Sequence, residues 1–243
     1  MGGEFAIFDA VRNDLQTNLA DVRDRIARAA ARSGRSVDKI SLVAVSKTHQ
    51  APAIRTAIAA GTRIFGENKV QESEPKINEI GRDETEWHLI GHLQSNKARK
   101  AVQLFDVIQT IDSLELATRL ERICLEESRE SLSVFVEVDL AGEVTKSGVS
   151  ENELSPIVEF LMNCKCLKFD GLMLLPPFFD DAEDARPYFK RLRAIRDELL
   201  AKSAFANGLG ELSMGMSNDF EIAIEEGATV VRVGTAIFGE RSM

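Results

Sequence analysis

The chain has 243 residues, of which 44% are hydrophobic and 28% are charged, and it carries a formal net charge of −9. This length is enough to bury a large core, and the composition is typical of a globular protein rather than a disordered one. An acidic chain is a poor match to a dedicated nucleic-acid binder, because such proteins neutralise phosphates with Lys and Arg. A small anionic ligand held at a local site remains compatible with this charge.

The chain has three cysteines, Cys124, Cys164 and Cys166. An odd and sparse set is not a disulfide framework and indicates a reducing compartment. Cys164 and Cys166 have no histidine nearby in the sequence, so we expect no metal site. No apolar run reaches the roughly 18–20 residues that span a bilayer. The N-terminus is acidic where a signal peptide is basic, so we expect a cytoplasmic protein, or one in an organelle stroma or matrix after removal of a transit segment.

The first 34 residues predict a helix that packs on the rest of the domain. Apolar residues recur there at steps of three and four and form one stripe, and Ser33-Gly34 ends the helix. The members of the stripe are Phe8, Val11, Leu15, Leu19, Val22, Ile26 and Ala29.

From residue 40 the chain alternates between short apolar, β-branched runs and longer stretches of helical period. The runs predict eight strands, at residues 40–46, 63–65, 86–90, 106–110, 132–139, 168–174, 211–214 and 229–233. The stretches between them predict helices at residues 52–60, 68–80, 94–103, 113–128, 151–162, 182–204 and 218–226. Several of the strands are continuously apolar, which is typical of a sheet covered by helices.

Eight strand–helix units predict an α/β fold, a (β/α)8 barrel of the TIM type with an extra N-terminal helix. No linker, charge block or repeat divides the chain, so we expect one domain over residues 1–243. The alternative is a doubly wound open sheet, but its G-x-G-x-x-G fingerprint does not follow the first strand. In a barrel, functional residues follow the C-terminal ends of the strands.

Polar residues lie at or near the ends of the first three predicted strands. Lys47 directly follows a buried run, and partial removal from water favours the neutral amine that Schiff-base chemistry requires. The alternative is a lysine that simply leaves the strand into water. Asn68 follows the second strand and either serves a site or caps the next helix. His88 fits a hydrogen-bonded residue of the barrel interior, and His92 fits the barrel mouth.

The last two strand ends carry the most specific pattern. Ser213, Met214 and Ser217 lie between the seventh strand and the next helix, where unpaired backbone N–H groups and hydroxyls favour an anion. Gly234 and Thr235 follow the eighth strand and add a close backbone approach and another hydroxyl. A phosphate commonly binds at these two loops in this fold. The alternative is that Ser217 only caps a helix.

Arg232 lies within the eighth strand between β-branched residues, so its buried charge needs either a core carboxylate or a ligand. Closure of a barrel makes the eighth strand a neighbour of the first, which brings Arg232 toward Lys47. One ligand satisfies these features together. Its aldehyde suits Lys47, its pyridine nitrogen suits Arg232 and its phosphate suits the two loops. That ligand is pyridoxal 5′-phosphate.

Seven segments of the chain closely resemble the pyridoxal phosphate homeostasis protein family, and together they cover nearly the whole sequence. The resemblance implies a single barrel similar to the N-terminal domain of alanine racemase. The segments are LVAVSKTH (42–49), FGENKVQE (65–72), WHLIGHLQSNK (87–97), TKSGVS (145–150), GLMLLPP (171–177), ARPYF (185–189) and the stretch 212–241.

The resemblance also implies roles for particular residues. It implies that Lys47 holds the cofactor as an aldimine, that Asn68 lies near the cofactor ring and that Arg232 faces the pyridine nitrogen. It implies phosphate contacts from Ser217, Gly234 and Thr235, with Ser213 and Met214 at the margin of the site. Small departures from the family pattern occur at Thr48-His49-Gln50, Leu89 and Asn218.

The function implied is intracellular cofactor homeostasis and delivery to apo-enzymes, without robust catalysis. Racemases with this barrel need a tyrosine from a further C-terminal domain, whereas this chain ends at Met243 and has Tyr188 as its only tyrosine. We therefore expect a monomeric, non-enzymatic binder with no nucleic-acid or membrane partner. The alternatives are a small amino-acid racemase or lyase that uses the same site, and a regulatory module that senses the cofactor.

Overall fold

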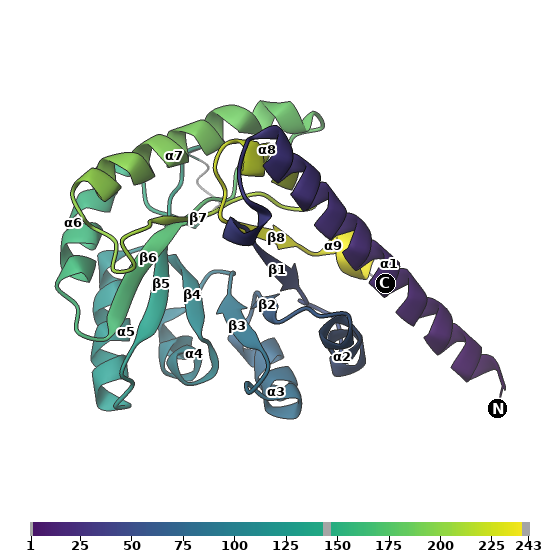
Figure 1. The fold of residues 1–243 in the computed structure, drawn as a ribbon. Coiled ribbons are helices and arrows are strands. Elements are labelled where there is room, and N and C mark those ends of the chain that lie inside the picture. Colours follow the sequence, from purple (N-terminus) through teal and green to yellow (C-terminus); the bar gives the residue numbers. More distant parts are fainter. Residues whose placement is uncertain (1, 143–146, 240–243) are drawn as a thin grey trace.

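The computed structural model describes residues 2–142 and 147–239, with side chains from residue 14 onward (Figure 1). Eight parallel strands close into a barrel in the order of the sequence, and the last strand pairs with the first. This architecture confirms the predicted (β/α)8 barrel. The strands are β1 (Ser41–Val45), β2 (Ile64–Glu67), β3 (Glu86–Leu89), β4 (Val107–Ile111), β5 (Leu132–Glu137), β6 (Leu167–Met173), β7 (Glu211–Ser213) and β8 (Val230–Val233).

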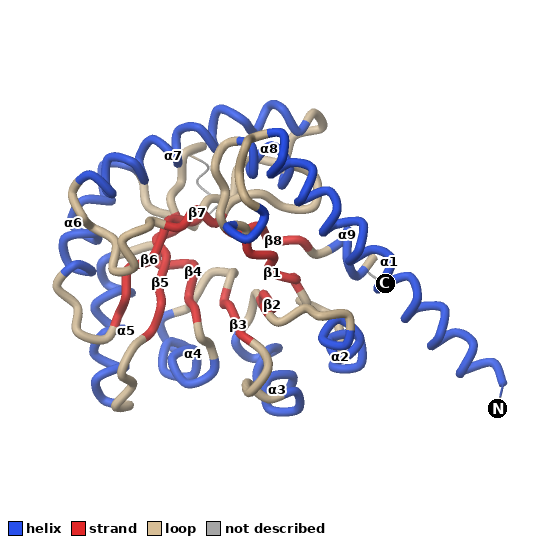
Figure 2. Tube along the Cα trace, in the orientation of Figure 1, coloured by secondary structure: helices blue, strands red, loops and turns tan. Residues whose placement is uncertain are grey.

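Helices surround the barrel on the outside (Figure 2). The α-helices are α1 (Gly2–Arg32), α2 (Ala51–Ala59), α3 (Val70–Ile80), α4 (Ala98–Leu104), α5 (Leu114–Glu126), α6 (Glu151–Met162), α7 (Arg186–Ala201), α8 (Phe220–Glu225) and α9 (Thr235–Phe238). Short 3₁₀ helices are η1 (Val37–Lys39), η2 (Ser95–Lys97) and η3 (Ala182–Ala185).

Two predicted helices differ from the structure in their first turn. The stretches at 94–103 and 182–204 begin with the 3₁₀ helices η2 and η3 and only then become α4 and α7. Helix α9 has no counterpart among the predicted helices, because four residues are too few to show a helical period.

The N-terminal helix α1 packs against α2, α8 and α9, beside the seam where the barrel closes. Five members of its apolar stripe are buried, from Leu15 to Ala29, while the side chains of Phe8 and Val11 lie outside the described residues. Gly34, with a φ of 68°, takes the chain out of the helix as expected. Residues 145 and 146 of the TKSGVS segment also lie outside the described part of the chain.

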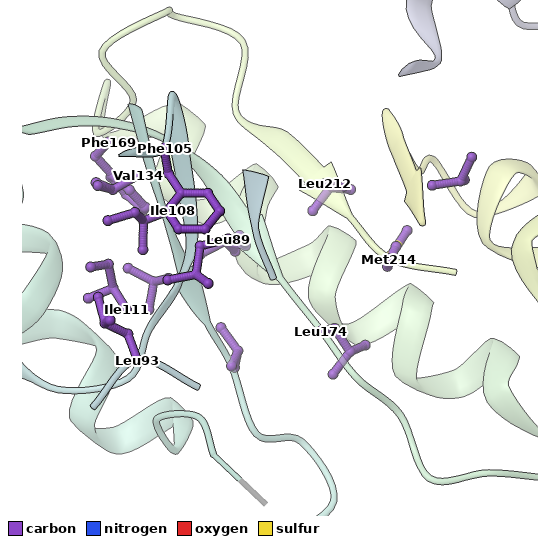
Figure 3. Close-up of a cluster of buried hydrophobic side chains, with 14 of the residues drawn as sticks. Leu89, Leu93, Phe105, Ile108, Ile111, Val134, Phe169, Leu174, Leu212 and Met214 are labelled. Atoms are coloured by element: carbon purple, nitrogen blue, oxygen red, sulfur yellow. The ribbon is translucent and has the colours of Figure 1, made fainter. Parts of the chain in front are cut away.

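The core has two layers, because alternate residues of each strand face opposite sides of the barrel wall. The larger layer lies between the strands and the helices, and Figure 3 shows part of it, including Leu89, Ile108 and Met214. Each fully buried Leu, Ile or Phe contributes about 1.5–3 kcal/mol of transfer free energy there. The smaller layer fills the barrel interior with Val43, Val107, Phe135, Met173 and Val230.

The seam between β1 and β8 sets the position of the two strand ends that matter most. Val43 pairs with Arg232, and Ala44 pairs with Val233. One step further along, a Cβ on Gly234 would lie 3.3 Å from the Cβ of Val45, so a glycine lets the two backbones approach closely. The chain therefore leaves β1 toward Lys47 directly beside the place where it leaves β8.

No helix in the described ranges is long and apolar enough to cross a membrane.

Candidate functional site

A cavity of about 500 Å³ opens at the C-terminal mouth of the barrel, and we call it the mouth cavity. Six of the eight residues expected at the site line it together, although they come from four different strand ends. They are Lys47, Asn68, Ser217, Arg232, Gly234 and Thr235. The cavity therefore lies on the β8–β1 seam, as closure of the barrel predicts.

The other two expected residues do not line the mouth cavity. Met214 is fully buried and packs in the outer core layer beside Leu212 (Figure 3). Ser213 is also fully buried, but it faces the barrel interior, where it contacts Arg232. The physical reason is the alternation along the strand, which turns Leu212 and Met214 toward the helices and Ser213 toward the barrel axis.

Lys47 is half-buried and follows the end of β1, which several hydrogen bonds of Ser46 fix in place. The backbone of Ser46 donates to the carbonyl of Gly66 at 3.0 Å, and the Ser46 hydroxyl donates to Glu67 Oε1 at 2.6 Å. The Lys76 ammonium donates both to the Ser46 carbonyl at 3.0 Å and to the Glu67 carboxylate. A buried ion pair thus fixes the backbone directly before Lys47, which limits where its side chain can go.

His49 lines the same cavity two residues further on. Its ring stacks on Phe238 with centroids 4.8 Å apart and an angle of 24° between the planes. Burial, followed by the nearby charge of Lys76, lowers the pKa of His49 below its usual value. The imidazole is therefore neutral at neutral pH and can accept a proton.

Asn68 reaches the cavity from the end of β2, half-buried and backed by Gly91. A Cβ on Gly91 would lie 2.4 Å from the carbonyl oxygen of Asn68 and 2.8 Å from its Cα. Only a glycine at position 91 allows the backbone of Asn68 to lie where it does.

The loops after β7 and β8 meet at Ser217, as the sequence predicts for a shared anion site. The Ser217 hydroxyl accepts from the backbone N–H groups of Gly234 and Ala236, each at 3.3 Å. Asp219 holds the loop after β7 in place, because its carboxylate accepts from the Met216 N–H at 2.6 Å. Because both N–H groups donate to its oxygen, the Ser217 hydroxyl keeps its proton for another acceptor, and we call this place the anion corner.

Arg232 forms the floor of the cavity and is only 2% exposed. Its guanidinium donates to the Ser213 hydroxyl at 2.5 Å and to the Leu174 carbonyl at 2.9 Å. Burial lowers the pKa of Arg232 to about 10, and the charges of Glu137 and Asp219 oppose this effect. Arg232 is therefore still a cation and a pure hydrogen-bond donor at neutral pH.

Sequence reasoning missed one wall of the cavity and one buried acid. The segment after β6 supplies an apolar wall that includes Pro176 and Phe179, with Phe178 79% exposed at the rim. The apolar run GLMLLPPFF, which continues past the predicted strand, was the signal for this wall. Glu137 ends β5 and is 3% exposed, and its Oε2 has no hydrogen-bond partner among the described residues. Burial raises the pKa of Glu137 to about 7.

The other two histidines, His88 and His92, do not line the mouth cavity. His88 is a buried residue of the barrel interior with hydrogen bonds to Glu86 and Gln109. His92 lies outside the mouth cavity and bonds to Asp112 at 2.8 Å. Across residues 2–142 and 147–239, no group of His, Cys, Asp and Glu side chains is arranged to hold a metal ion.

Comparison with known families agrees with this geometry. The family model described as alanine racemase, N-terminal domain, matches residues 17–242. Solved alanine racemases share the fold, such as the one from Corynebacterium glutamicum, with a TM-score of 0.69 and 18% identity. That similarity covers 96% of this chain and 62% of the racemase chain.

Much closer similarity is found among proteins of the same length. The pyridoxal phosphate homeostasis protein of Escherichia coli K12 is 43% identical over 240 residues, covering 94% of this chain and 97% of the relative. The Aquifex aeolicus protein of that name is 40% identical and covers 92% and 96%. The PipY structure from Synechococcus elongatus, solved with PLP (pyridoxal phosphate) bound, has a TM-score of 0.81 and 39% identity, and covers 93% and 100%. The chain therefore belongs to the pyridoxal phosphate homeostasis protein family, whose barrel is that of the alanine racemase N-terminal domain.

Proposed function

We propose that this protein binds pyridoxal 5′-phosphate in the mouth cavity and serves cofactor homeostasis inside the cell. It holds the cofactor and delivers it to apo-enzymes, without robust catalysis of its own. The observation that carries the proposal is that one cavity combines a lysine, a buried arginine and the anion corner. The PLP-bound PipY structure, from a 39% identical relative, supports the choice of ligand.

The residues present fit this ligand on the evidence of the cavity itself. The hydroxyls of Ser217 and Thr235 line the cavity and can donate to a phosphate, and the N–H groups of Gly234 and Ala236 hold the Ser217 hydroxyl in place. A side chain at Gly234 would crowd Val45 and narrow this corner. The volume of about 500 Å³ lies in the usual range for small-molecule cavities.

Lys47 is the residue to which we assign covalent attachment. A neutral lysine amine condenses reversibly with an aldehyde, which is the chemistry that bound pyridoxal phosphate supplies here. The buried Lys76–Glu67 pair holds the backbone directly before Lys47, and the apolar wall around Phe179 lines the same cavity.

The proposed lack of robust catalysis rests on two features. Arg232 can only donate, so a pyridine nitrogen facing it stays unprotonated and makes a poorer electron sink. Tyr188, which is the only tyrosine of the chain, packs against Phe179 and is not among the residues that line the mouth cavity. A phenol that could exchange protons with a bound substrate is thus missing from the lining.

The test is the absorbance of the purified protein together with its turnover. We expect a long-wavelength band from lysine-attached cofactor in the wild type and loss of that band in Lys47→Ala. Lys100→Ala is the control, because Lys100 lies on the surface of α4 and pairs with Glu74. Turnover of an amino acid faster than about 1 per second, a low rate for an enzyme, would overturn the carrier proposal.

A small amino-acid racemase or lyase is the second candidate, and His49 is the observation that favours it. Its neutral imidazole lines the cavity beside Lys47 and can accept a proton. Exchange of the Cα proton of alanine, serine or threonine in heavy water distinguishes the two functions. A carrier leaves this proton in place on the time scale of binding, whereas a racemase or lyase exchanges it.

We also propose that the protein is a monomer and that its partners are the apo-enzymes that receive the cofactor. Light scattering at several concentrations tests the first statement. The second is tested by whether cofactor transfer to an apo-enzyme is faster from the loaded protein than from the same concentration of free cofactor.

A further inference from the structure

A continuous chain of hydrogen bonds crosses the barrel interior from Arg232 to Glu86, and we call it the relay. Arg232 donates to Ser213 Oγ at 2.5 Å, and Ser213 Oγ donates to Gln109 Oε1 at 2.6 Å. Gln109 Nε2 lies 2.7 Å from His88 Nδ1, and His88 Nε2 lies 2.7 Å from Glu86 Oε1. Four of its five members are buried, and only Glu86 reaches the surface.

The relay connects the two ends of the barrel. Glu86 is the first residue of β3, at the end of the barrel opposite the mouth cavity. Ser213 and Gln109 belong to β7 and β4, which are separated in the sheet by β5 and β6, so their bond crosses the interior. Bonds of this kind are strengthened in a low-dielectric interior.

The direction of every bond in the relay is fixed by its two ends. Arg232 can only donate, so Ser213 Oγ accepts from it and sends its single proton to Gln109 Oε1. The Gln109 amide nitrogen then donates to His88 Nδ1, which leaves the ring proton on Nε2. That proton points at the Glu86 carboxylate, and its hydrogen bond lowers the pKa of Glu86.

The reverse orientation of the Gln109 amide breaks this pattern. Its NH₂ group would face Ser213 Oγ, which already accepts from Arg232, and the Ser213 proton would lose its acceptor. Its carbonyl would then face His88 Nδ1, which would have to carry the ring proton. In a neutral ring Nε2 would then be unprotonated, and two acceptors, Nε2 and the Glu86 carboxylate, would face each other. Only the orientation with the carbonyl on Ser213 pairs every donor with an acceptor.

In the described part of the chain, the Arg232 guanidinium has two hydrogen-bond acceptors. One is the Ser213 hydroxyl, which belongs to the relay. The other is the Leu174 carbonyl at 2.9 Å. Glu137 and Asp219 contribute charge near Arg232, but neither accepts a hydrogen bond from it in that part of the chain. The plane of the guanidinium is thus set by Ser213 and Leu174, and Ser213 is held by Gln109.

We propose that Ser213, Gln109 and His88 are positioning residues for Arg232, and that their relay fixes the guanidinium at the floor of the mouth cavity by tying it to Glu86 at the opposite end of the barrel. The inference rests on the proposed function for the identity of the ligand that Arg232 meets. Which atom donates and which accepts at each bond of the relay depends on the protein alone and not on any ligand.

The first test is nitrogen NMR of the His88 ring in the cofactor-free protein at neutral pH. We expect the tautomer with the proton on Nε2 and an unprotonated, hydrogen-bonded Nδ1. Gln109→Leu should shift the Nδ1 signal toward that of an unbonded nitrogen. A ring with its proton on Nδ1 in the wild type would overturn the relay, whatever the protein binds.

The second test compares the binding of pyridoxal phosphate with that of pyridoxine phosphate, which carries an alcohol in place of the aldehyde and cannot react with Lys47. We expect Gln109→Leu to weaken both by about tenfold, the loss expected for one buried hydrogen-bonded contact. Ser133→Ala is the matched control, since it removes a 2.6 Å bond to Asp170 outside the relay. Equal binding by the wild type and the folded Gln109→Leu protein would overturn the positioning role.

The two proposals fail separately. Wild-type protein that binds neither compound overturns the proposed function and leaves the NMR test of the relay intact. Wild-type protein that binds pyridoxal phosphate while His88 has its proton on Nδ1 overturns the relay alone.

Discussion

The Lys76 ammonium contacts both oxygens of the Glu67 carboxylate, at 2.7 and 2.9 Å, and so connects helix α3 to the end of β2. Lys76 is 8% exposed and Glu67 is 1% exposed. The pair also binds two polar groups of Ser46, the hydroxyl through Glu67 and the carbonyl through Lys76. The ends of the neighbouring strands β1 and β2 are thereby connected directly before Lys47.

Removing one partner of the Lys76–Glu67 pair should strongly lower the stability of the folded protein. We expect Lys76→Met to lower the free energy of unfolding by about 3–5 kcal/mol, because it leaves the Glu67 carboxylate buried without its counter-charge. Urea unfolding measures the loss. The double variant Lys76→Met/Glu67→Gln should regain most of it, since no uncompensated charge remains.

A surface lysine provides the control for this measurement. Lys100 pairs with Glu74 at 2.7 Å, but both side chains are more than a third exposed. We expect Lys100→Met to cost less than about 1 kcal/mol. A similar small loss for Lys76→Met would contradict the structural role given to the buried pair.

Stability should depend on pH through Glu137. Burial raises its pKa from 4.5 to about 7, so within this range the folded protein holds a proton that the unfolded chain has already lost. Stability from this group therefore falls as the pH rises across that window and is constant above it. We expect Glu137→Gln to stabilise the protein at pH 8 by an amount on the order of 3 kcal/mol.

Measurements on Glu137→Gln at low pH provide the control for this prediction. Below the unfolded-state pKa of 4.5 the carboxyl is protonated in both states, so the advantage of Glu137→Gln should vanish there. Thermal melts at a series of pH values give both limits. A constant difference between the two proteins at every pH would show that Glu137 does not titrate as the structure indicates.

Ser217→Ala should weaken ligand binding through the anion corner. The variant removes the hydroxyl that the N–H groups of Gly234 and Ala236 contact, and with it one donor to an anion. We expect the dissociation constant of pyridoxal phosphate to rise about tenfold or more, since hydrogen bonds to charged groups contribute about 1.5–3 kcal/mol. Equilibrium dialysis measures the change.

Ser150→Ala is the matched serine variant for that experiment. Ser150 is the N-cap of α6 and forms a capping box with Glu153, and it does not line the cavity, so loss of its hydroxyl should affect stability but not binding. Equal dissociation constants for Ser217→Ala and the wild type would argue against the anion corner as the phosphate site.

Gly91→Ala should disturb the cavity through Asn68 without adding a polar group. The new Cβ would lie 2.4 Å from the Asn68 carbonyl oxygen, so one of the two backbones must move. We expect a loss of about 1–3 kcal/mol in stability, the usual cost of overpacking, together with weaker binding. A variant with unchanged melting temperature and affinity would show that the contact relaxes freely.

The sequence by itself determined the order of elements and the placement of the site along the chain. Both ends of all eight strands lie within two residues of their predicted positions, because buried parallel strands are apolar runs separated by stretches of helical period. Closure of eight such units brings β8 beside β1, which is why the sequence alone predicts that Lys47 and Arg232 lie near one another.

Only the tertiary structure decided which of the polar residues near the strand ends reach the cavity. Ser213 and Met214 are adjacent in sequence, yet one faces the barrel axis and the other the helices, and neither lines the cavity. Likewise Glu67, Lys76, Gln109 and Glu137 gave no local signal. Their roles come from contacts between strands and helices that are far apart in the chain, and such contacts exist only after the barrel has closed and removed these side chains from water.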